Sequence, residues 1–396
     1  MNILMLTPYL PYPLVSGGQI RTYNLLKNLC TQHNITLFSY IRSDDERKYI
    51  SKLEPYCKKI VVFKRGPVWT PKNILLSQFS FHPLLVTMYR SIKLEAAIQK
   101  ELQSNKYNLI HAETFYMMPN IPKTILPVIL VVQTIEHLGY KEFTRRLALP
   151  FLKPFLYWDV RKIKYWEEHY WRTATRLITM SEEDKQYILH RVQNVGSIDV
   201  VANGVDIEFF RQTKKEKTKD FNILFVGTFK WLPNVEAVTY LVERVWKQIS
   251  AAIPNAKLLI VGNSPSPKIE KYAVDDKTVI VKGHVRDIRD AYSKANVLLA
   301  PVWSGKGTRY KILEAMATET PIVATPLAVE GLGVKDGVQA LIADTAEDLA
   351  ASVIKLQSDS KLAATLANNG KQLVEKNYDW KSISKDLDTI YNQVGR

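Results

Sequence analysis

The stretch that decides the fold is Ser304–Thr325, SGKGTRYKILEAMATETPIVAT. It places a loop with Gly305 and Gly307 before an amphipathic helical pattern, which stops at Pro321 ahead of an apolar, β-rich segment. A helix that begins after a flexible loop presents free backbone N–H groups and the positive end of its dipole. The stretch therefore predicts a loop–helix–strand unit of an α/β sheet, with an anion site where the helix begins.

Three charged residues near the start of this helix indicate which anion it binds. Arg309 and Lys311 add two fixed cations to the N-terminal N–H groups. Glu314 would weaken a site for phosphate alone, but its carboxylate can accept hydrogen bonds from the vicinal hydroxyls of a sugar. Phosphate groups beside a ribose diol indicate a nucleotide. A surface loop with scattered charges is the alternative for this segment.

Strands and helices alternate on both sides of this stretch. In the second half the pattern predicts strands at 223–226, 257–261, 278–281, 297–299 and 321–324, and helices at 233–249, 287–295, 309–317, 346–357, 360–376 and 378–394. In the first half it predicts strands at 2–7, 35–40, 60–63, 109–112, 128–132, 177–180 and 199–201, a helix at 19–30 and a long helical region between 139 and 175. Strands separated by helices predict parallel sheets with helices on both faces.

A polar linker, RQTKKEKTKD (211–220), follows the turn sequence NGVD (203–206) and separates the two halves. We expect an N-terminal Rossmann-like domain at 1–205, a nucleotide-binding Rossmann-like domain at 206–377, and a C-terminal helix at 378–396 that returns to the first domain. Two α/β domains face each other across a cleft, and ligands in such sheets bind beyond the carboxyl ends of the strands.

Composition limits the class of protein. The 396 residues carry a net charge of +15, and residues 1–200 hold 27 Lys and Arg against 16 Asp and Glu. The basic first half suggests an anionic membrane surface, a phosphorylated acceptor or nucleic acid as partner. No apolar run is long enough to span a membrane. Only two cysteines, without metal spacing, favour the cytoplasm.

Further candidate residues follow strands of the first half. Gly17 and Gly18 precede the first helix and allow a close approach of backbone to ligand. Glu113 ends one predicted strand, and Glu136 and His137 follow the next. Two carboxylates and a histidine at strand ends are suited to acceptor binding or proton transfer. For His137 the alternative is a capping or core histidine.

With these motifs, the full length of the chain resembles the GT-B glycosyltransferases of the GT4 type. The block GTRYKILEAMATETPIVAT resembles a signature of that family, and PYPLVSGGQIRTYNLLKNL, ANGVD and VGTFKWLPNVEAV resemble its opening loop, its interdomain crossing and the entry to its second domain. The resemblance implies transfer of a sugar, with retention, from a nucleotide-diphosphate sugar, and we expect the nucleotide to be UDP. No metal is expected, because Arg309 and Lys311 can stabilise the negative charge of the leaving diphosphate. No other cofactor is expected, since the nucleotide sugar is a substrate.

The resemblance also implies roles for single residues. Glu314 matches the glutamate that holds the ribose, and Glu113 occupies a family active-site position that often has His. The donor-binding set is Gly17, Gly18, Gly227, Lys230, Gly305, Lys306, Gly307, Thr308, Arg309, Lys311 and Glu314, and the catalytic set is Glu113, Glu136, His137, Arg309 and Lys311. Two departures stand out, because Lys306 replaces a glutamate and Glu319 a glycine of the family patterns.

The acceptor is an unknown saccharide or lipid-linked molecule, and polysaccharide biosynthesis is the expected setting. Residues 143–171 alternate bases with aromatic side chains, as in helices that lie at a membrane interface. We therefore expect a peripheral position on the inner face of the membrane, with contacts from Lys141, Arg145, Arg146, Lys153, Arg161, Lys162, Lys164, Phe151, Phe155 and Trp158. Packing of these aromatics between helix and sheet is the alternative.

Three competing functions differ in class. A GT-B-fold nucleotide-sugar epimerase needs the same two domains, but the 307–317 block argues against it. A non-enzymatic protein that binds nucleic acid or another polyanion would explain the charge but not the nucleotide-like loop, and no nucleic-acid-binding motif is present. A degenerate transferase that binds without catalysis is suggested by Lys306 and Glu319.

Overall fold

The structure, a computed structural model, describes residues 1–67, 70–147, 149–283, 285–305 and 307–395. The chain forms two compact units. The first comprises Met1–Asn203 and Lys381–Arg396, and the second comprises Gly204–Trp380. The chain therefore leaves the first unit at Asn203 and returns to it at Lys381.

The first unit contains a seven-stranded parallel sheet in the order β3-β2-β1-β4-β5-β6-β7. Its strands are β1 (Asn2–Thr7), β2 (Asn34–Ile41), β3 (Lys59–Lys64), β4 (Leu109–Glu113), β5 (Val128–Val132), β6 (Arg176–Thr179) and β7 (Ser197–Val200). The central strands β1 and β4 are almost wholly buried, as continuous apolar runs predict for a parallel sheet covered on both faces.

Four helices of the first unit begin after serine or threonine, which favour helix N-termini. The helices of the first unit are α1 (Gly17–Leu29), α2 (Pro71–Phe79), α3 (Leu84–Tyr89), α4 (Ile92–Ser104), α5 (Glu136–Arg146), α6 (Lys153–Thr173) and α7 (Glu182–Arg191), and the last helix of the chain is α17 (Trp380–Val394). Ser16, Thr70, Ser91 and Ser181 each accept a hydrogen bond from a backbone N–H in the first turn of the helix that follows.

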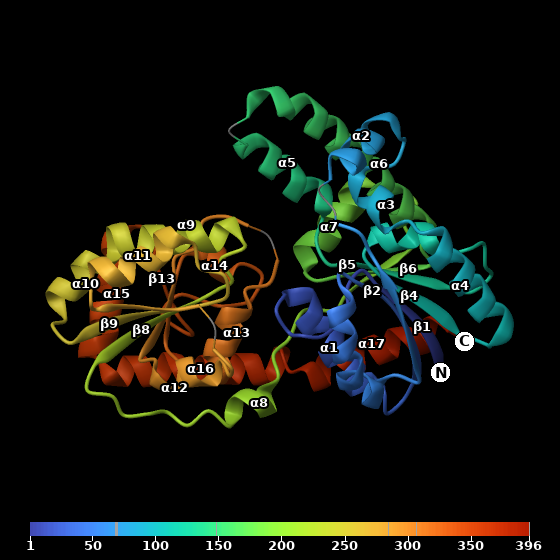
Figure 1. The fold of residues 1–396 in the computed structure, drawn as a ribbon. Helices are drawn as coiled ribbons and strands as arrows, with labels where there is room; N and C mark the ends of the chain where they lie inside the picture. Colours follow the sequence, from blue (N-terminus) through green and yellow to red (C-terminus); the bar gives the residue numbers. More distant parts are fainter. Residues whose placement is uncertain (68–69, 148, 284, 306, 396) are drawn as a thin grey trace. The chain divides into compact units, whose positions relative to one another are not determined.

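The predicted helical region between 139 and 175 is a helical hairpin. Helices α5 and α6 pack along each other, joined through a short 3₁₀ turn at Pro150–Leu152, and α2 packs beside α6 (Figure 1). The ammonium of Lys153, at the start of α6, donates a 3.0 Å hydrogen bond to the carbonyl of Arg145 at the end of α5. This contact closes the hairpin near its tip.

The C-terminal helix packs on the first unit, as predicted. From α17, the Tyr391 hydroxyl lies 2.8 Å from Nδ1 of His111 on β4, and Asp388 lies 2.8 Å from Nε2 of His33. Asp388 ends the sequence Asp386-Leu387-Asp388 of α17, and its pairing with His33 gives it a structural role.

The second unit contains a six-stranded parallel sheet in the order β10-β9-β8-β11-β12-β13. Its strands are β8 (Phe221–Val226), β9 (Ala256–Val261), β10 (Val279–Lys282), β11 (Val297–Ala300), β12 (Ile322–Ala324) and β13 (Leu341–Ile342). Its helices are α8 (Ile207–Arg211), α9 (Leu232–Tyr240), α10 (Trp246–Ala252), α11 (Pro267–Asp275), α12 (Arg289–Lys294), α13 (Tyr310–Ala317), α14 (Pro326–Val329), α15 (Ala346–Ser358) and α16 (Ser360–Asn377). Helices α9 and α11 lie over one face of this sheet, and α12 and α16 lie over the other (Figure 1).

The predicted fold class, two parallel α/β sheets with a returning C-terminal helix, is confirmed. The structure differs from the predicted elements in several details. The helices that were not among those predicted are α2, α3, α4, α7, α8, α11 and α14. The helix expected at 233–249 contains a π-helical turn at Leu241–Val245, which joins α9 to α10. The two-residue strand β13 was too short for an apolar pattern to reveal it. Within the described ranges, no helix is both long and apolar enough to cross a membrane.

Candidate functional site

The loop between β11 and α13 has a backbone that requires glycine. Gly305 and Gly307 have φ values of +94° and +93°, in the region that L-residues with a side chain rarely adopt. A Cβ atom on Gly305 would also lie 3.0 Å from Cγ of Pro233 on α9. The two glycines therefore allow the loop to turn tightly into the N-terminus of α13. Lys306, predicted to bind the donor, lies outside the described residues.

Arg309 occupies the N-cap position of α13, and its guanidinium bends back over the loop. It donates hydrogen bonds to the carbonyls of Gly307 at 2.7 Å and Gly305 at 2.8 Å. Burial lowers the pKa of Arg309, while the charge of Glu330 opposes this change. The contacts fix a cation at the end of the helix that already carries partial positive charge.

Lys311, the second residue of α13, is almost fully buried, with 8% of its surface exposed. Its ammonium donates a 3.0 Å hydrogen bond to Oδ1 of Asn234 and lies 4.2 Å from the centre of the Phe225 ring. Burial and the nearby charge of Arg309 lower the pKa of Lys311 to about 7. Because no carboxylate among the described residues pairs directly with this ammonium, it is suited to an anionic ligand that would restore its charge.

Glu314 lies one turn further along α13 and is held by a tyrosine. The buried Tyr292 of α12 donates its hydroxyl hydrogen to Oε2 of Glu314 at 2.9 Å. Burial raises the pKa of Glu314, and the Tyr292 hydrogen bond and the charge of Lys311 act in the opposite direction. The other carboxylate oxygen remains available to accept a hydrogen bond from a hydroxyl.

The turn after β8 supports Lys311 from the other side. A Cβ atom on Gly227 would lie 2.7 Å from the side-chain carbonyl carbon of Asn234, so glycine there lets the amide reach the backbone. The Asn234 amide donates a 2.9 Å hydrogen bond to the carbonyl of Thr228 and thereby turns its oxygen toward Lys311. Gly227 is thus a support for this site, and Lys230, four residues beyond β8, is exposed.

In the first unit, the hydroxyl group of Tyr9 packs directly against Gly18. A Cβ atom there would lie 1.7 Å from the hydroxyl oxygen of Tyr9 and 2.8 Å from Oε1 of Gln133. Tyr9 donates a 3.1 Å hydrogen bond to that same Gln133 oxygen. Gly17 and Gly18 form the first turn of α1, so the predicted glycine loop is the N-terminus of a helix.

Glu113, the last residue of β4, is fully buried and has both oxygens occupied. His111 Nε2 lies 3.1 Å from one oxygen, and the Gln133 amide donates a 2.6 Å hydrogen bond to the other. Burial raises the pKa of Glu113, but the contacts with His111, Gln133 and the charge of Arg21 outweigh burial and lower it. In this arrangement Glu113 holds Gln133, which in turn holds Tyr9 against Gly18.

Glu136 and His137 begin α5 and have different surroundings. Glu167 of α6 accepts hydrogen bonds from the backbone N–H groups of Glu136 and His137, at 2.8 and 3.0 Å, and lies 2.6 Å from His137 Nδ1. His137 Nε2 lies 3.0 Å from the Tyr187 hydroxyl. Both ring nitrogens of this buried histidine therefore have partners within the first unit.

The Glu136 carboxyl, by contrast, lines a small cavity at the ends of β4 and β5. Burial and the charge of Glu167 raise the pKa of Glu136 to about 8. Thr114, also on this cavity, has a φ of +83°, a strained value for a β-branched residue. A carboxyl with a strongly raised pKa beside strained backbone is typical of a functional site.

The predicted site residues thus form two groups, one in each unit. Arg309, Lys311 and Glu314 gather at the N-terminus of α13. In the first unit, Gly18, Glu113 and Gln133 form one connected set, and Glu136, at the start of α5, lines the same cavity as Gln133. The sequence reasoning did not identify Asn234, Tyr292, Gln133 and Glu167 as parts of these groups. Among them, only Asn234 stands inside a motif already quoted, VGTFKWLPNVEAV. Among the residues that the structure describes, no three His, Cys, Asp or Glu side chains form a group that could hold a metal ion.

Two family models match the chain. The model of Glycosyltransferase Family 4 matches residues 15–209, and the model of Glycosyl transferases group 1 matches residues 220–359. The chain therefore belongs to glycosyltransferase family 4, whose members are also called group 1 glycosyltransferases, and it is a nucleotide-sugar glycosyltransferase with the GT-B fold.

Individual relatives agree with this assignment. The chain is 21% identical over 397 residues to an uncharacterized 44.6 kDa protein in the cps region of Klebsiella pneumoniae, covering 98% of both chains. It is 24% identical over 236 residues to the capsular polysaccharide biosynthesis glycosyltransferase CapM of Staphylococcus aureus, covering 55% of this chain and 62% of that one. Among solved structures, the Anabaena protein HepE, in complex with UDP and glucose, has a TM-score of 0.67 at 16% identity and covers 99% of this chain and 100% of HepE.

Proposed function

We propose that this chain transfers a sugar from a UDP-sugar to a saccharide or lipid-linked acceptor in the biosynthesis of a surface polysaccharide. The observation that carries the donor assignment is the group at the start of α13, where Arg309, Lys311 and Glu314 gather within two turns of helix. UDP as the nucleotide is supported by the fold shared with HepE, which was solved with UDP and glucose. A role in the biosynthesis of a capsular polysaccharide is supported by the names of the Klebsiella and Staphylococcus relatives.

The donor would bind with its diphosphate at the N-terminus of α13. Negative charge accumulates on the leaving diphosphate as the bond to the sugar C1 breaks. Arg309, Lys311 and the helix N–H groups stabilise that charge in the transition state more than in the ground state. Glu314, oriented by Tyr292, accepts hydrogen bonds from the ribose hydroxyls.

These cations perform the task that a divalent ion performs in other transferases. We therefore propose a mechanism without metal, with retention of configuration as the family resemblance implies. Transfer should continue in EDTA at the wild-type rate. A complete loss that Mn²⁺ or Mg²⁺ restores would overturn the metal-free mechanism.

For the acceptor side we propose Glu136 as the carboxyl that contacts the acceptor hydroxyl, with Glu113 and His137 as positioning residues. Glu136 lines a cavity and has a pKa near 8, so it can exchange a proton close to neutral pH. Glu113 holds Gln133, and His137 stays between Glu167 and Tyr187.

The most direct test is thermal unfolding of the protein in the presence of UDP, GDP, ADP and dTDP and their sugars. A ligand at about 100 times its dissociation constant stabilises a protein by about 2.7 kcal/mol. We expect UDP and one UDP-sugar to raise the unfolding temperature more than the other nucleotides. The proposal of a UDP-sugar donor is wrong if another nucleotide stabilises the protein more, or if none does. Hydrolysis of the stabilising donor, followed as release of UDP, then identifies the sugar.

A further inference from the structure

On α2 and on the tip of the α5–α6 hairpin, large apolar side chains are exposed among the residues that the structure describes. On α2, Leu75 and Phe79 are 61% and 87% exposed. At the tip and on the first turns of α6, Phe151, Phe155 and Trp158 are 66%, 56% and 51% exposed. These five residues define what we call the aromatic surface. Large apolar side chains gathered in this way mark an interaction site on a protein that is otherwise folded around buried cores.

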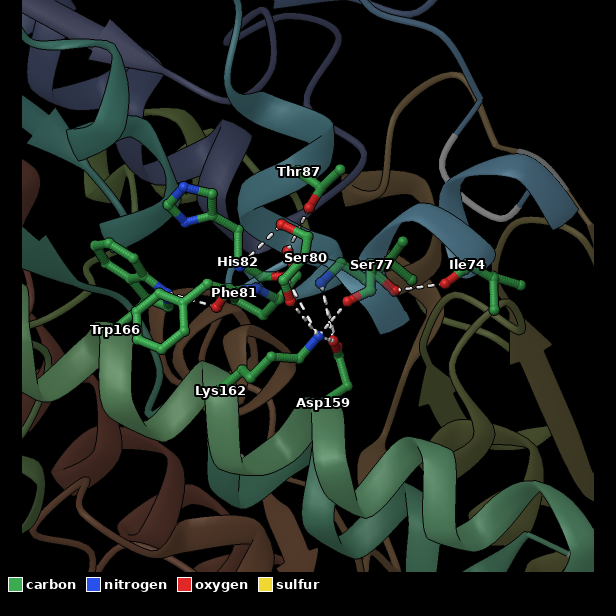
Figure 2. A network of polar contacts seen from close by, with 11 residues as sticks. Ile74, Ser77, Ser80, Phe81, His82, Thr87, Asp159, Lys162 and Trp166 are labelled. Atoms are coloured by element: carbon green, nitrogen blue, oxygen red, sulfur yellow. Dashed lines mark hydrogen bonds and ion pairs between the residues drawn. The ribbon is translucent and has the colours of Figure 1, made fainter.

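Buried polar groups hold the two parts of this surface together. Lys162 of α6 donates hydrogen bonds to the carbonyls of Ser77 and Ser80, at and just beyond the last turn of α2 (Figure 2). Asp159, one turn earlier on α6, accepts a 3.0 Å hydrogen bond from the N–H of Leu84, where α3 begins. Lys162 was predicted to contact a membrane, but that prediction is wrong because the side chain is buried under the α2–α3 segment.

A third contact continues the same face of α6. The indole N–H of Trp166 donates a 3.1 Å hydrogen bond to the carbonyl of Phe81, and the two rings lie 5.7 Å apart (Figure 2). The polar face of α6 is therefore used to hold the segment that follows α2. The apolar side chains of α2 and of the hairpin tip are left outside this contact.

The charge around the aromatic surface is strongly positive. Segments 71–82 and 141–164 together contain eight Lys and Arg residues, one of which is the buried Lys162, against two acids. Both acids have partners, because Glu142 bonds Arg145 and Arg146, and Asp159 bonds Lys162. Lys141, Arg145 and Arg161 are exposed beside the aromatic residues. An exposed surface of this composition is complementary to the negative headgroups and the apolar boundary of a lipid bilayer.

We infer that the aromatic surface docks the protein on an anionic membrane, with the aromatic side chains at the headgroup–acyl boundary and the bases on the headgroups. This inference rests on the proposed function for its purpose, since a docked enzyme would meet a lipid-linked acceptor. A second copy of the chain is a poorer occupant. A two-fold interface uses the same surface of both copies and would therefore bring two positively charged surfaces together. A bilayer offers an apolar boundary for the exposed apolar side chains and negative headgroups for the bases.

The test is sedimentation of the protein with vesicles of pure phosphatidylcholine and of equal parts phosphatidylcholine and phosphatidylglycerol. We expect binding to the anionic vesicles at low salt, release at high salt because exposed charges are then screened, and little binding to the neutral vesicles. The triple variant Phe79→Ser, Phe151→Ser, Phe155→Ser should bind at least tenfold more weakly. The matched control Ile92→Ser, Ile125→Ser, which alters two isoleucines that are 82% and 103% exposed elsewhere in the first unit, should bind like the wild type.

A second pair of variants tests whether the exposed bases beside the aromatic surface contribute to vesicle binding. Lys141→Glu, Arg145→Glu, Arg161→Glu should abolish sedimentation, whereas the control Lys100→Glu, Lys106→Glu, Lys123→Glu, with three exposed bases elsewhere in the first unit, should retain most of it. An equal loss in both would mean that total charge alone attracts the vesicle, and the docking surface would be wrong.

UDP-dependent thermal stabilisation, measured on the same preparations, separates the two proposals. Normal UDP binding without sedimentation would overturn the membrane inference alone. Light scattering completes the test, because a mass that doubles with concentration and returns to the monomer value in the Phe→Ser variant would assign the surface to a second copy instead.

Discussion

The ammonium of Lys311 lies 3.0 Å from Oδ1 of Asn234 and 4.2 Å from the centre of the Phe225 ring, so its contacts in the unit are a neutral amide and an aromatic face. Burial and Arg309 lower the pKa of this lysine to about 7. Above pH 7, a lysine held this way gains its full charge only when an anion binds beside it. Binding of a diphosphate should therefore be coupled to the uptake of a proton.

We predict that the affinity for UDP falls as the pH rises from 7 to 9. Above pH 7 Lys311 is mostly neutral in the free protein, so binding of the diphosphate must be accompanied by uptake of a proton from the buffer. Below pH 7 the lysine is already charged and the affinity levels off. Calorimetry at pH 8 in two buffers of different ionisation enthalpy should reveal uptake of close to one proton. Lys311→Met should remove the uptake and weaken binding by about 1.5–3 kcal/mol. Equal heats in both buffers would contradict this role of Lys311.

Glu314 and Tyr292 give a second prediction, based on the 2.9 Å hydrogen bond between them. Glu314→Ala should weaken UDP binding by about 1–3 kcal/mol, because the ribose hydroxyls lose their acceptor. Tyr292→Phe should weaken it by about 1 kcal/mol, since the carboxylate stays but loses its orientation. Glu270→Ala, an exposed acid on α11, is the control and should have no effect. If deoxyuridine diphosphate loses as much affinity as UDP in Glu314→Ala, the carboxylate does not contact the missing hydroxyl.

Glu136 gives a prediction on stability that needs no acceptor. Its pKa in the folded protein is raised to about 8, so ionisation is disfavoured by folding. The wild type should therefore lose stability as the pH rises from about 4.5 to 8 and lose no more above that range. Glu136→Gln lacks the ionisation and should be more stable than the wild type by about 1–3 kcal/mol at pH 8, with little difference at pH 4.5.

Denaturant unfolding at both pH values measures this difference. If Glu136→Gln raises the free energy of unfolding equally at both pH values, ionisation of the buried Glu136 is not the cause of the increase. The variant should also transfer sugar more slowly, because a residue that costs stability where it stands is kept for its function.

Much of the fold was predictable because parallel sheets bury continuous apolar runs. The runs at β1 and β8 were visible as such, and the alternation with helices fixed the fold class. Helices α2 and α3 were not predicted. Leu75 and Phe79 of α2 are exposed, so its apolar residues do not follow the periodicity of a helix with one buried face.

The site was predictable where a motif is local and not where it depends on distant contacts. Arg309, Lys311 and Glu314 stand within six residues of one another, so their gathering follows from helical spacing. The contact of Tyr292 with Glu314 joins two elements that only the sheet brings together. Spacing alone also could not reveal that Lys162 points inward, since its neighbours Arg161 and Lys164 have the same charge and are more exposed.

Glu319 stands where the family pattern has glycine, and its backbone explains the preference. It has a φ of +51° just beyond the end of α13, in the left-handed region that glycine adopts without strain. We predict that Glu319→Gly stabilises the protein by about 0.5–1 kcal/mol. Glu319→Gly also removes the 2.6 Å ion pair with the partly exposed Lys371, but a surface ion pair of this kind contributes little to the free energy of unfolding. Lys371→Ala is the control for that pair, and unfolding in urea measures both. A Glu319→Gly variant that is less stable than Lys371→Ala would contradict the assignment of strain.

The last prediction concerns Lys162, which joins α6 to the end of α2. Lys162→Met should leave the Asp159 carboxylate and the carbonyls of Ser77 and Ser80 without their cation in a buried place. Removing one partner of a buried charged pair costs about 3–5 kcal/mol. We expect the cost to appear as local opening, because α2 is held to α6 chiefly through this group.

Hydrogen exchange should then become faster in residues 74–84, while the amides of β1 and β4 exchange as before. Lys164→Met, a more exposed lysine on the same helix, should leave the exchange of 74–84 unchanged. The double variant Lys162→Met, Asp159→Asn should recover part of the protection, since the stranded charge is gone. Unchanged protection of 74–84 in Lys162→Met would mean that apolar packing, and not the buried ammonium, holds α2 in place.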